Sequence, residues 1–115
     1  MKAARVFSAL LLFAFLAGCR AHMVMIKLVN TSADPLSTII IDYPSATFGK
    51  DKLAPSETFS STVKLTDNGP LKIQFTDANG RNHTSTGPVL HKNQAGIIEI
   101  RFTQDKATAN VNLPR

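Results

Sequence analysis

The fold of this chain is decided by the stretch Leu71-Lys72-Ile73-Gln74-Phe75-Thr76-Asp77-Ala78-Asn79-Gly80. Its first six residues alternate between apolar and polar side chains, which is the period of a strand with one buried face. The four residues that follow are typical of a hairpin turn, because an Asn-Gly pair can supply positive φ. We therefore predict a strand, a tight turn, and a returning polar strand that Gly87-Pro88 ends.

The same period of two recurs along most of the chain. One segment contains Ile39-Ile40-Ile41, a β-branched run that favours a strand covered on both faces. Turn residues separate most of these segments, and no segment has the pattern of an amphipathic helix. The strands that we expect cover 24–29, 37–43, 58–66, 71–76, 81–86, 97–103 and 107–113.

About seven short strands in one small domain indicate an all-β fold. We predict a single antiparallel β-sandwich over 24–115, of immunoglobulin-like or transthyretin-like shape. A closed barrel of strands is the alternative. The cysteine pair and core Trp of immunoglobulin domains are absent, because the chain has one cysteine and no Trp.

The segment 45–57 lacks a clear period and is expected to be a long loop. Long loops in compact domains are often functional, so we predict a binding site at its tip, with Lys50, Asp51 and Lys52. Phe48 and Leu53 are expected to pin the loop to the core. The alternative is that the loop only connects the two sheets and its lysines are solvated.

The N-terminal segment has the layout of a secretory signal peptide. Lys2 and Arg5 precede an apolar run over 6–16, and Ala17-Gly18 places two small residues before Cys19. At this length the run is too short to span a bilayer as a helix, which needs about 20 residues.

Leu16-Ala17-Gly18-Cys19 also resembles the bacterial lipobox, the cleavage site of lipoprotein signal peptidase. The resemblance implies a signal peptide over 1–18, a lipid-bearing Cys19, and a short tether over 19–23. It also implies outer-membrane sorting, because Arg20 rather than aspartate follows the cysteine. Without lipidation, cleavage near Ala17 or Ala21, or an uncleaved anchor, is the alternative.

The chemistry-bearing residues form no recognisable catalytic or metal motif. His22, His83 and His91 lack metal-ligand spacing, and no Gly-x-Ser-x-Gly motif is present. Asp42 and Glu99 are each expected in the middle of a strand. They could act as an acid/base pair only if the fold brought them close together. We therefore expect no enzyme activity, no cofactor and no metal.

Nucleic acid is not an expected partner. The net charge of +5 includes Lys2 and Arg5 of the expected signal peptide, and the other basic residues are scattered. The succession of motifs between Asn30 and Ile100 is similar to small uncharacterised bacterial envelope domains of β-sandwich type, a resemblance that brings no catalytic residues.

These features predict a bacterial lipoprotein that acts as a non-catalytic interaction module in the cell envelope. Its expected partners are membrane lipid, through acylated Cys19, and another envelope protein. The alternative is a periplasm-facing binding protein for an anionic ligand, a glycan or a lipid headgroup. A concave cluster of Lys50, Lys52 and aromatic residues would favour that alternative, and an exposed flat edge would favour the interaction module.

Overall fold

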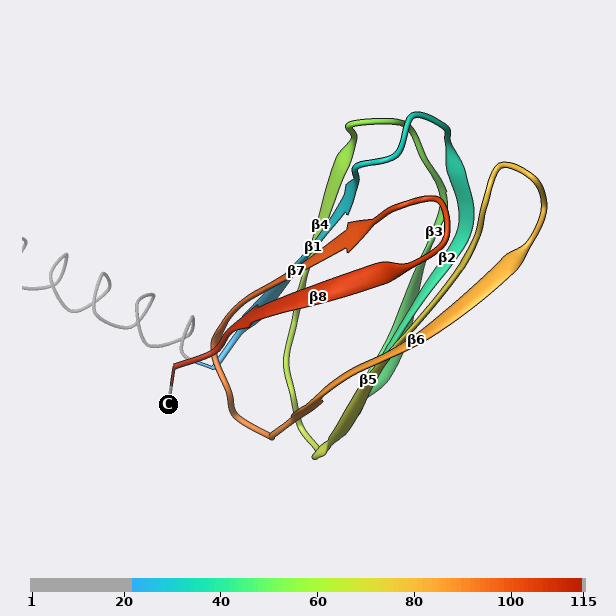
Figure 1. Cartoon of the computed structure of the whole chain (residues 1–115). Helices are drawn as coiled ribbons and strands as arrows, with labels where there is room; N and C mark the ends of the chain where they lie inside the picture. Colours follow the sequence, from blue (N-terminus) through green and yellow to red (C-terminus); the bar gives the residue numbers. More distant parts are fainter. Residues whose placement is uncertain (1–21, 115) are drawn as a thin grey trace, which may run out of the picture.

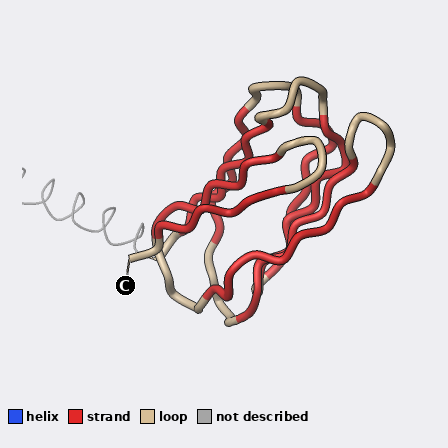
Figure 2. Tube along the Cα trace, viewed as in Figure 1, coloured by secondary structure: helices blue, strands red, loops and turns tan. Residues whose placement is uncertain are grey.

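The computed structural model describes residues 22–114, which form eight strands and no helix (Figures 1 and 2). Within that range, no helix is long and apolar enough to cross a membrane. The predicted signal peptide and Cys19 lie outside the described residues. The strands are β1 (Val24–Asn30), β2 (Leu36–Tyr43), β3 (Ala46–Leu53), β4 (Thr58–Val63), β5 (Gly69–Thr76), β6 (Asn82–Leu90), β7 (Gly96–Phe102) and β8 (Ala107–Asn112).

The strands form two four-stranded sheets that pack face to face as a sandwich (Figure 1). The first sheet has the order β4-β1-β7-β8, and the second has the order β3-β2-β5-β6. Within the two sheets, six pairs of neighbouring strands are hydrogen-bonded, and five of these pairs are antiparallel. The exception is β1 with β7, which run parallel from Val24↔Gly96 to Asn30↔Phe102. The prediction of a wholly antiparallel sandwich is therefore wrong at this pair.

The core lies between the sheets. It is built from every second residue of a strand, the one whose side chain faces inward. On β5, Leu71, Ile73 and Phe75 are buried, while Lys72 and Gln74 are exposed, as the alternation predicts. Phe75 meets Phe102 of the other sheet edge to face, with ring centroids 5.2 Å apart. The other core side chains are Val24, Ile26, Leu28, Leu36, Ile39, Ile41, Leu53, Val63, Leu65, Leu90, Ile98 and Ile100.

The prediction of a loop over 45–57 is wrong, because most of this segment is β3. It pairs with β2 from Leu36↔Leu53 to Tyr43↔Ala46, and only Pro44 and Ser45 separate the two strands. β3 is an edge strand that contributes one fully buried side chain, Leu53, to the core. An edge strand with so little buried surface shows no apolar alternation, so its period could not be recognised. This strand raises the number from the predicted seven to eight.

β6 also differs from its prediction, since it continues through Gly87-Pro88 to Leu90. β6 is an edge strand, where a proline without an N–H can be accommodated. The pairing with β5 shifts register between Pro70 and Lys72, next to this proline.

The chain order places the turns at two opposite ends of the sandwich (Figure 1). We call one the His22 end; it consists of residues 22–23, 44–45, 64–68, 91–95 and 113–114. We call the other the Asp77 end; it consists of 31–35, 54–57, 77–81 and 103–106. The eight residues of β5 run from one end to the other, a span of about 26 Å at the usual rise per residue.

Candidate interaction surfaces

The loops of the Asp77 end are held by a buried asparagine. Asn30, at the end of β1, is fully buried, and its Nδ2 donates to the carbonyls of Asp34 and Leu53, each at 2.9 Å. Its Oδ1 accepts from the backbone N–H of Ser32 at 2.9 Å and from the Ser32 hydroxyl at 2.7 Å. The amide thus links β1 of one sheet to the end of β3 in the other.

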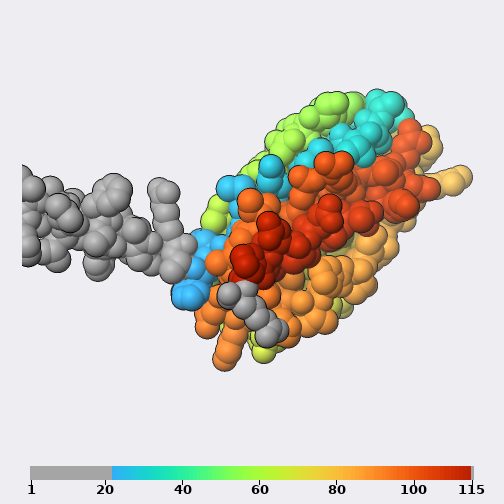
Figure 3. Space-filling model, turned by 60° about the vertical axis from the view of Figure 1, so that its left-hand side comes forward, coloured from blue at the N-terminus to red at the C-terminus, as the bar shows by residue number. Residues whose placement is uncertain are grey.

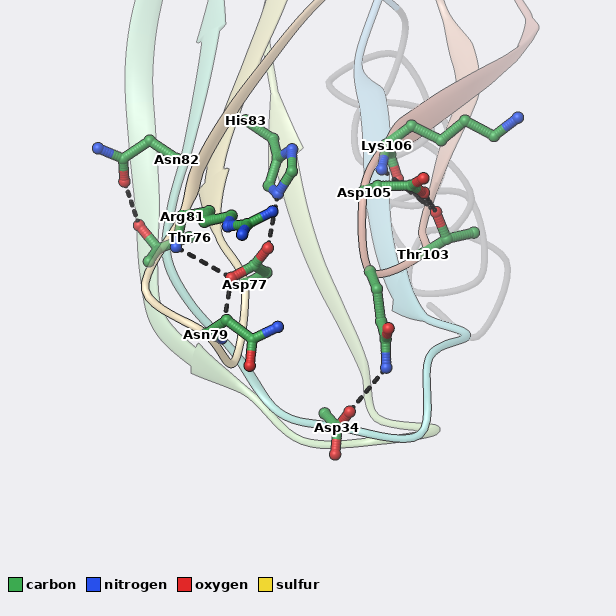
Figure 4. A network of polar contacts seen from close by, with 11 residues as sticks. Asp34, Thr76, Asp77, Asn79, Arg81, Asn82, His83, Thr103, Asp105 and Lys106 are labelled. Carbon is green, nitrogen blue, oxygen red and sulfur yellow. Dashed lines mark hydrogen bonds and ion pairs between the residues drawn. The ribbon is translucent and has the colours of Figure 1, made fainter.

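Asp77 organises the turn between β5 and β6 (Figure 4). Its Oδ1 accepts from the backbone N–H groups of Asn79, at 2.9 Å, and Arg81, at 3.0 Å. Its Oδ2 lies 2.8 Å from His83 Nε2. The hydrogen bond with His83, followed by the one from the Arg81 backbone, holds the pKa of Asp77 below its ordinary value. Gly80 supplies the positive φ of the predicted turn, at 82°, whereas Asn79 does not adopt one.

The imidazole of His83 is positioned from two sides. It stacks on Phe75 with ring centroids 4.9 Å apart, while Asp77 holds its Nε2. The side chains of Asp77 and His83 are 8% and 21% exposed, so this pair lies at the margin of the core rather than in free solvent. The sequence analysis considered His83 only as a possible metal ligand and missed this pair. The available signal was the placement of Asp77 and His83 on either side of an Asn-Gly turn.

A hollow of about 400 Å³ opens at the Asp77 end, between the turns after β1, β5 and β7 (Figure 4). Gln104 Nε2 donates to Asp34 Oδ2 at 2.7 Å and so connects two of these turns. Among residues 22–114, no three His, Cys, Asp or Glu side chains gather closely enough to hold a metal ion. The lining of the hollow consists of Asp34, Asp77, Ala78, Asn79, Arg81, His83, Thr103, Gln104 and Asp105.

Two backbone hydrogen bonds and one side-chain contact connect the segments of the His22 end. His22 Nδ1 lies 3.0 Å from the Asn93 carbonyl, and the Met23 carbonyl accepts from the Gly96 N–H at 3.2 Å. Asn93 N–H in turn donates to the Leu65 carbonyl at 2.9 Å. The exposed His22 side chain thus contacts the turn between β6 and β7. A shallow hollow of about 650 Å³ lies here, lined by His22, His91, Lys92, Asn93, Gln94, Ala95 and Pro114.

The predicted binding residues Phe48, Lys50, Asp51 and Lys52 lie on edge strand β3 rather than at a loop tip. Phe48 is partly buried, with its ring centroid 6.2 Å from that of Tyr43 and 6.4 Å from that of Phe59. Lys50 Nζ lies 4.9 Å from the centre of the Phe59 ring, in cation–π range. Neither Lys50 nor Lys52 lines the two hollows described above. A binding role for these residues stays a prediction.

A third hollow, of about 320 Å³, lies over β2, β5 and β6. It sits beside a bulge of β2, where Thr38 has a φ of 49° and the register with β5 shifts. Its lining consists of Thr38, Ile40, Gln74, Phe75, Thr76, Asn82, His83 and Thr84, and includes none of the predicted site residues.

The outer edge of the first sheet is strand β4, which pairs on one side with β1. Its residues Thr58-Phe59-Ser60-Ser61-Thr62-Val63 include no charge and no proline. The opposite edge strand, β8, packs beside β6. On the β4 side, by contrast, the sheets are linked through side chains, with Phe48 and Lys50 against Phe59.

Asp42 and Glu99 are not brought together. They lie on β2 and β7, in different sheets. Asp42 accepts from the Thr47 hydroxyl at 3.0 Å, and Glu99 accepts from Arg101 Nε at 2.6 Å. The hydrogen bond from Arg101 lowers the pKa of Glu99.

Comparison with known proteins supports the fold alone. No protein family and no curated protein sequence matches this chain. The NMR structure of a protein from Eubacterium rectale is similar, with a TM-score of 0.59 and 14% sequence identity. The similarity covers 82% of this chain and 90% of that one.

Proposed function

We propose that this protein is a bacterial lipoprotein, anchored through an acylated Cys19, that acts as a non-catalytic interaction module in the cell envelope. Three consecutive features support the anchor. Two basic residues come first, an apolar run follows them, and Leu16-Ala17-Gly18-Cys19 ends the run. The finer fold type, an immunoglobulin-like or transthyretin-like sandwich, stays a prediction.

The position of His22 gives the proposed anchor a definite orientation. The His22 side chain contacts the Asn93 carbonyl, and Cys19 precedes His22 by three residues, which span at most about 11 Å when fully extended. The His22 end then lies near the membrane. The Asp77 end can lie up to one strand length, about 26 Å, farther away.

The uncharged free edge of β4 is the observation that carries the interaction role. Natural sheets protect their edges with charges, prolines, bulges or covering segments, because an open edge can pair with another chain. β3 carries Lys50, Asp51 and Lys52, β6 carries Pro88, and β8 packs beside β6. β4 has neither charge nor proline, so it offers a partner protein a strand to which another strand can add.

Photo-cross-linking in cells tests this role. A photoreactive side chain replaces Ser60 of β4 or, as a matched control, Thr108 of β8; both residues are exposed and lie on edge strands of one sheet. We expect a discrete cross-linked protein from position 60 and none from position 108.

Charge on the edge provides the second half of the test. The double variant Ser60→Lys with Thr62→Lys should abolish the cross-linked species, whereas Thr108→Lys with Asn110→Lys should leave it intact. Equal cross-linking from the two edges, or a species that survives the β4 lysines, would contradict strand addition at β4.

The proposal also places the lipoprotein in the outer membrane, facing the periplasm, because Arg20 rather than aspartate follows Cys19. Sucrose-gradient fractionation tests this location. Comigration of the protein with inner-membrane markers would refute it.

A further inference from the structure

We propose that the His22 end rests directly on an anionic lipid surface, so that the domain has a second contact with the membrane besides the acyl chains. This inference depends on the proposed anchor at Cys19. The observation behind it is the distribution of exposed apolar side chains, together with the short tether between Cys19 and β1.

All four large apolar side chains that are exposed among residues 22–114 lie toward the His22 end. Met25 and Ile97 are the second residues of β1 and β7, which start there, while Val89 and Val111 are the penultimate residues of β6 and β8, which finish there. Their exposed fractions are 39% for Met25, 45% for Ile97, 59% for Val89 and 41% for Val111.

Two of these side chains form a pair. Met25 and Ile97 are direct partners in the parallel β1–β7 register and so point to the same face, opposite to the buried Val24 and Ile98. Met25 follows Cys19 by six residues and Ile97 is its direct partner, so the pair lies near the proposed lipid. Apolar side chains in such a position can enter the headgroup and acyl boundary.

The charges of the two ends favour the same orientation. The turns of the His22 end carry Lys64 and Lys92 against one carboxylate, Asp67. The turns of the Asp77 end carry four carboxylates against two cations; these residues are Asp34, Glu57, Asp77, Asp105, Arg81 and Lys106. An anionic surface attracts lysines and repels carboxylates within a Debye length, so it draws the His22 end inward.

A lipid surface fits this end better than a protein partner does. The exposed apolar side chains are distributed around the end of the domain, on strands of both sheets, and do not form one groove. The β5–β6 hairpin protrudes at the opposite end (Figure 3). A planar lipid surface that meets this end on the outer face of the first sheet touches Met25 and Ile97 together. Val89 points outward from the second sheet, and Val111 lies on the same side as buried Ile98, so neither belongs to this contact.

Tryptophan substitution tests the contact, because the chain contains no Trp. The acylated full chain, as Ile97→Trp or Ala78→Trp, is reconstituted into vesicles of phosphatidylethanolamine with a minor fraction of phosphatidylglycerol. We expect the Trp at position 97 to show blue-shifted emission and quenching by brominated acyl chains. The Trp at position 78, in the exposed β5–β6 turn, should behave as in water.

Charge reversal tests the electrostatic part with a matched control. In the Ile97→Trp background, Lys64→Glu with Lys92→Glu should reduce the quenching at low salt. Arg81→Glu with Lys106→Glu makes the same change of net charge at the opposite end and should leave the quenching unchanged. Equal effects of the two double variants would overturn the proposed anionic contact.

The mass of each reconstituted sample separates the two proposals. If Cys19 carries acyl chains but both tryptophans remain in a water-like environment, the direct contact is wrong and the anchor stands. If Cys19 carries no acyl chain, the anchor itself is wrong, and the contact that depends on it is wrong as well.

Discussion

The Nδ2 amide of Asn30 donates to the carbonyl oxygen of Leu53 at 2.9 Å and thereby joins the two sheets at the Asp77 end. Asn30 is fully buried and makes three further hydrogen bonds, to Asp34 and Ser32. Every donor and acceptor of this side chain is therefore hydrogen-bonded. Asn30 lies at the end of β1, where the chain passes from the first sheet to the second.

Removing this amide is expected to destabilise the fold. Asn30→Ala leaves two carbonyls and one backbone N–H without this partner at a buried site, so we expect the free energy of unfolding to fall by about 2–4 kcal/mol. Ser32→Ala, which removes only the hydroxyl, should cost about 1 kcal/mol. Urea unfolding measures both, and equal costs would contradict the role assigned to Asn30.

The Asp77–His83 pair is expected to make stability depend on pH. Since the pKa of Asp77 is lowered in the folded protein, its ionised form stabilises the fold above the ordinary pKa of 3.8. This stabilisation is lost as the pH falls through the lower, folded-state value. Asp77→Asn should therefore differ most from the wild type above about pH 4, and the difference should shrink on acidification.

Asn79→Ala is the control for this experiment, because the Asp77 carboxylate accepts from the backbone of residue 79 and not from its side chain. The variant should keep the pH dependence of the wild type in thermal unfolding. A difference between Asp77→Asn and the wild type that stays constant down to acid pH would show that Asp77 stabilises the turn without its charge.

Phe48 and Lys50 are expected to stabilise the β3–β4 side of the sandwich. Phe48→Ala should cost about 1–3 kcal/mol, less than a fully buried phenylalanine, because its ring is only partly buried. Lys50→Met keeps an apolar stem but removes the ammonium group above Phe59, at a cost of about 0.5–1 kcal/mol. Lys52→Met, at an exposed position, is the control and should change the unfolding midpoint little; an equal effect of the two methionines would contradict the Lys50–Phe59 contact.

The binding prediction for the same strand is tested separately from stability. Lys50→Glu with Lys52→Glu reverses two charges on β3, and weaker envelope association of the non-lipidated protein would support a binding site there. If association does not change, β3 serves the sandwich alone. The contact with Phe59 means that some loss of stability from Lys50→Glu is now expected as well.

The sequence predicted those parts of the fold in which one face is buried. β1, β4, β5 and β7 alternate as expected, because their inward residues form the core. Edge strand β3 escaped recognition, since Leu53 is its single fully buried residue. Pro88 suggested a break that an edge strand does not need. The parallel pairing of β1 with β7 joins segments about 70 residues apart, which local patterns cannot show.

The candidate surfaces were harder to predict, because they depend on residues brought together by the fold. Asparagine is common in turns, yet Asn30 is fully buried. Its burial is explained by β3, whose residue Leu53 accepts a hydrogen bond from the Asn30 amide. Asp77 and His83 face each other because the turn between them folds back. The resemblance of Leu16-Ala17-Gly18-Cys19 to a lipobox, in contrast, rests on contiguous residues and needs no structure to be noticed.

Intact mass spectrometry of the protein extracted from membranes tests the anchor at Cys19 most directly. The proposal predicts a chain that starts at Cys19 and carries two or three acyl chains, which at about 0.8 kcal/mol per buried CH₂ would make release from the membrane negligible. A chain that starts at any other residue, or one that starts at Cys19 without acyl chains, would contradict the proposal.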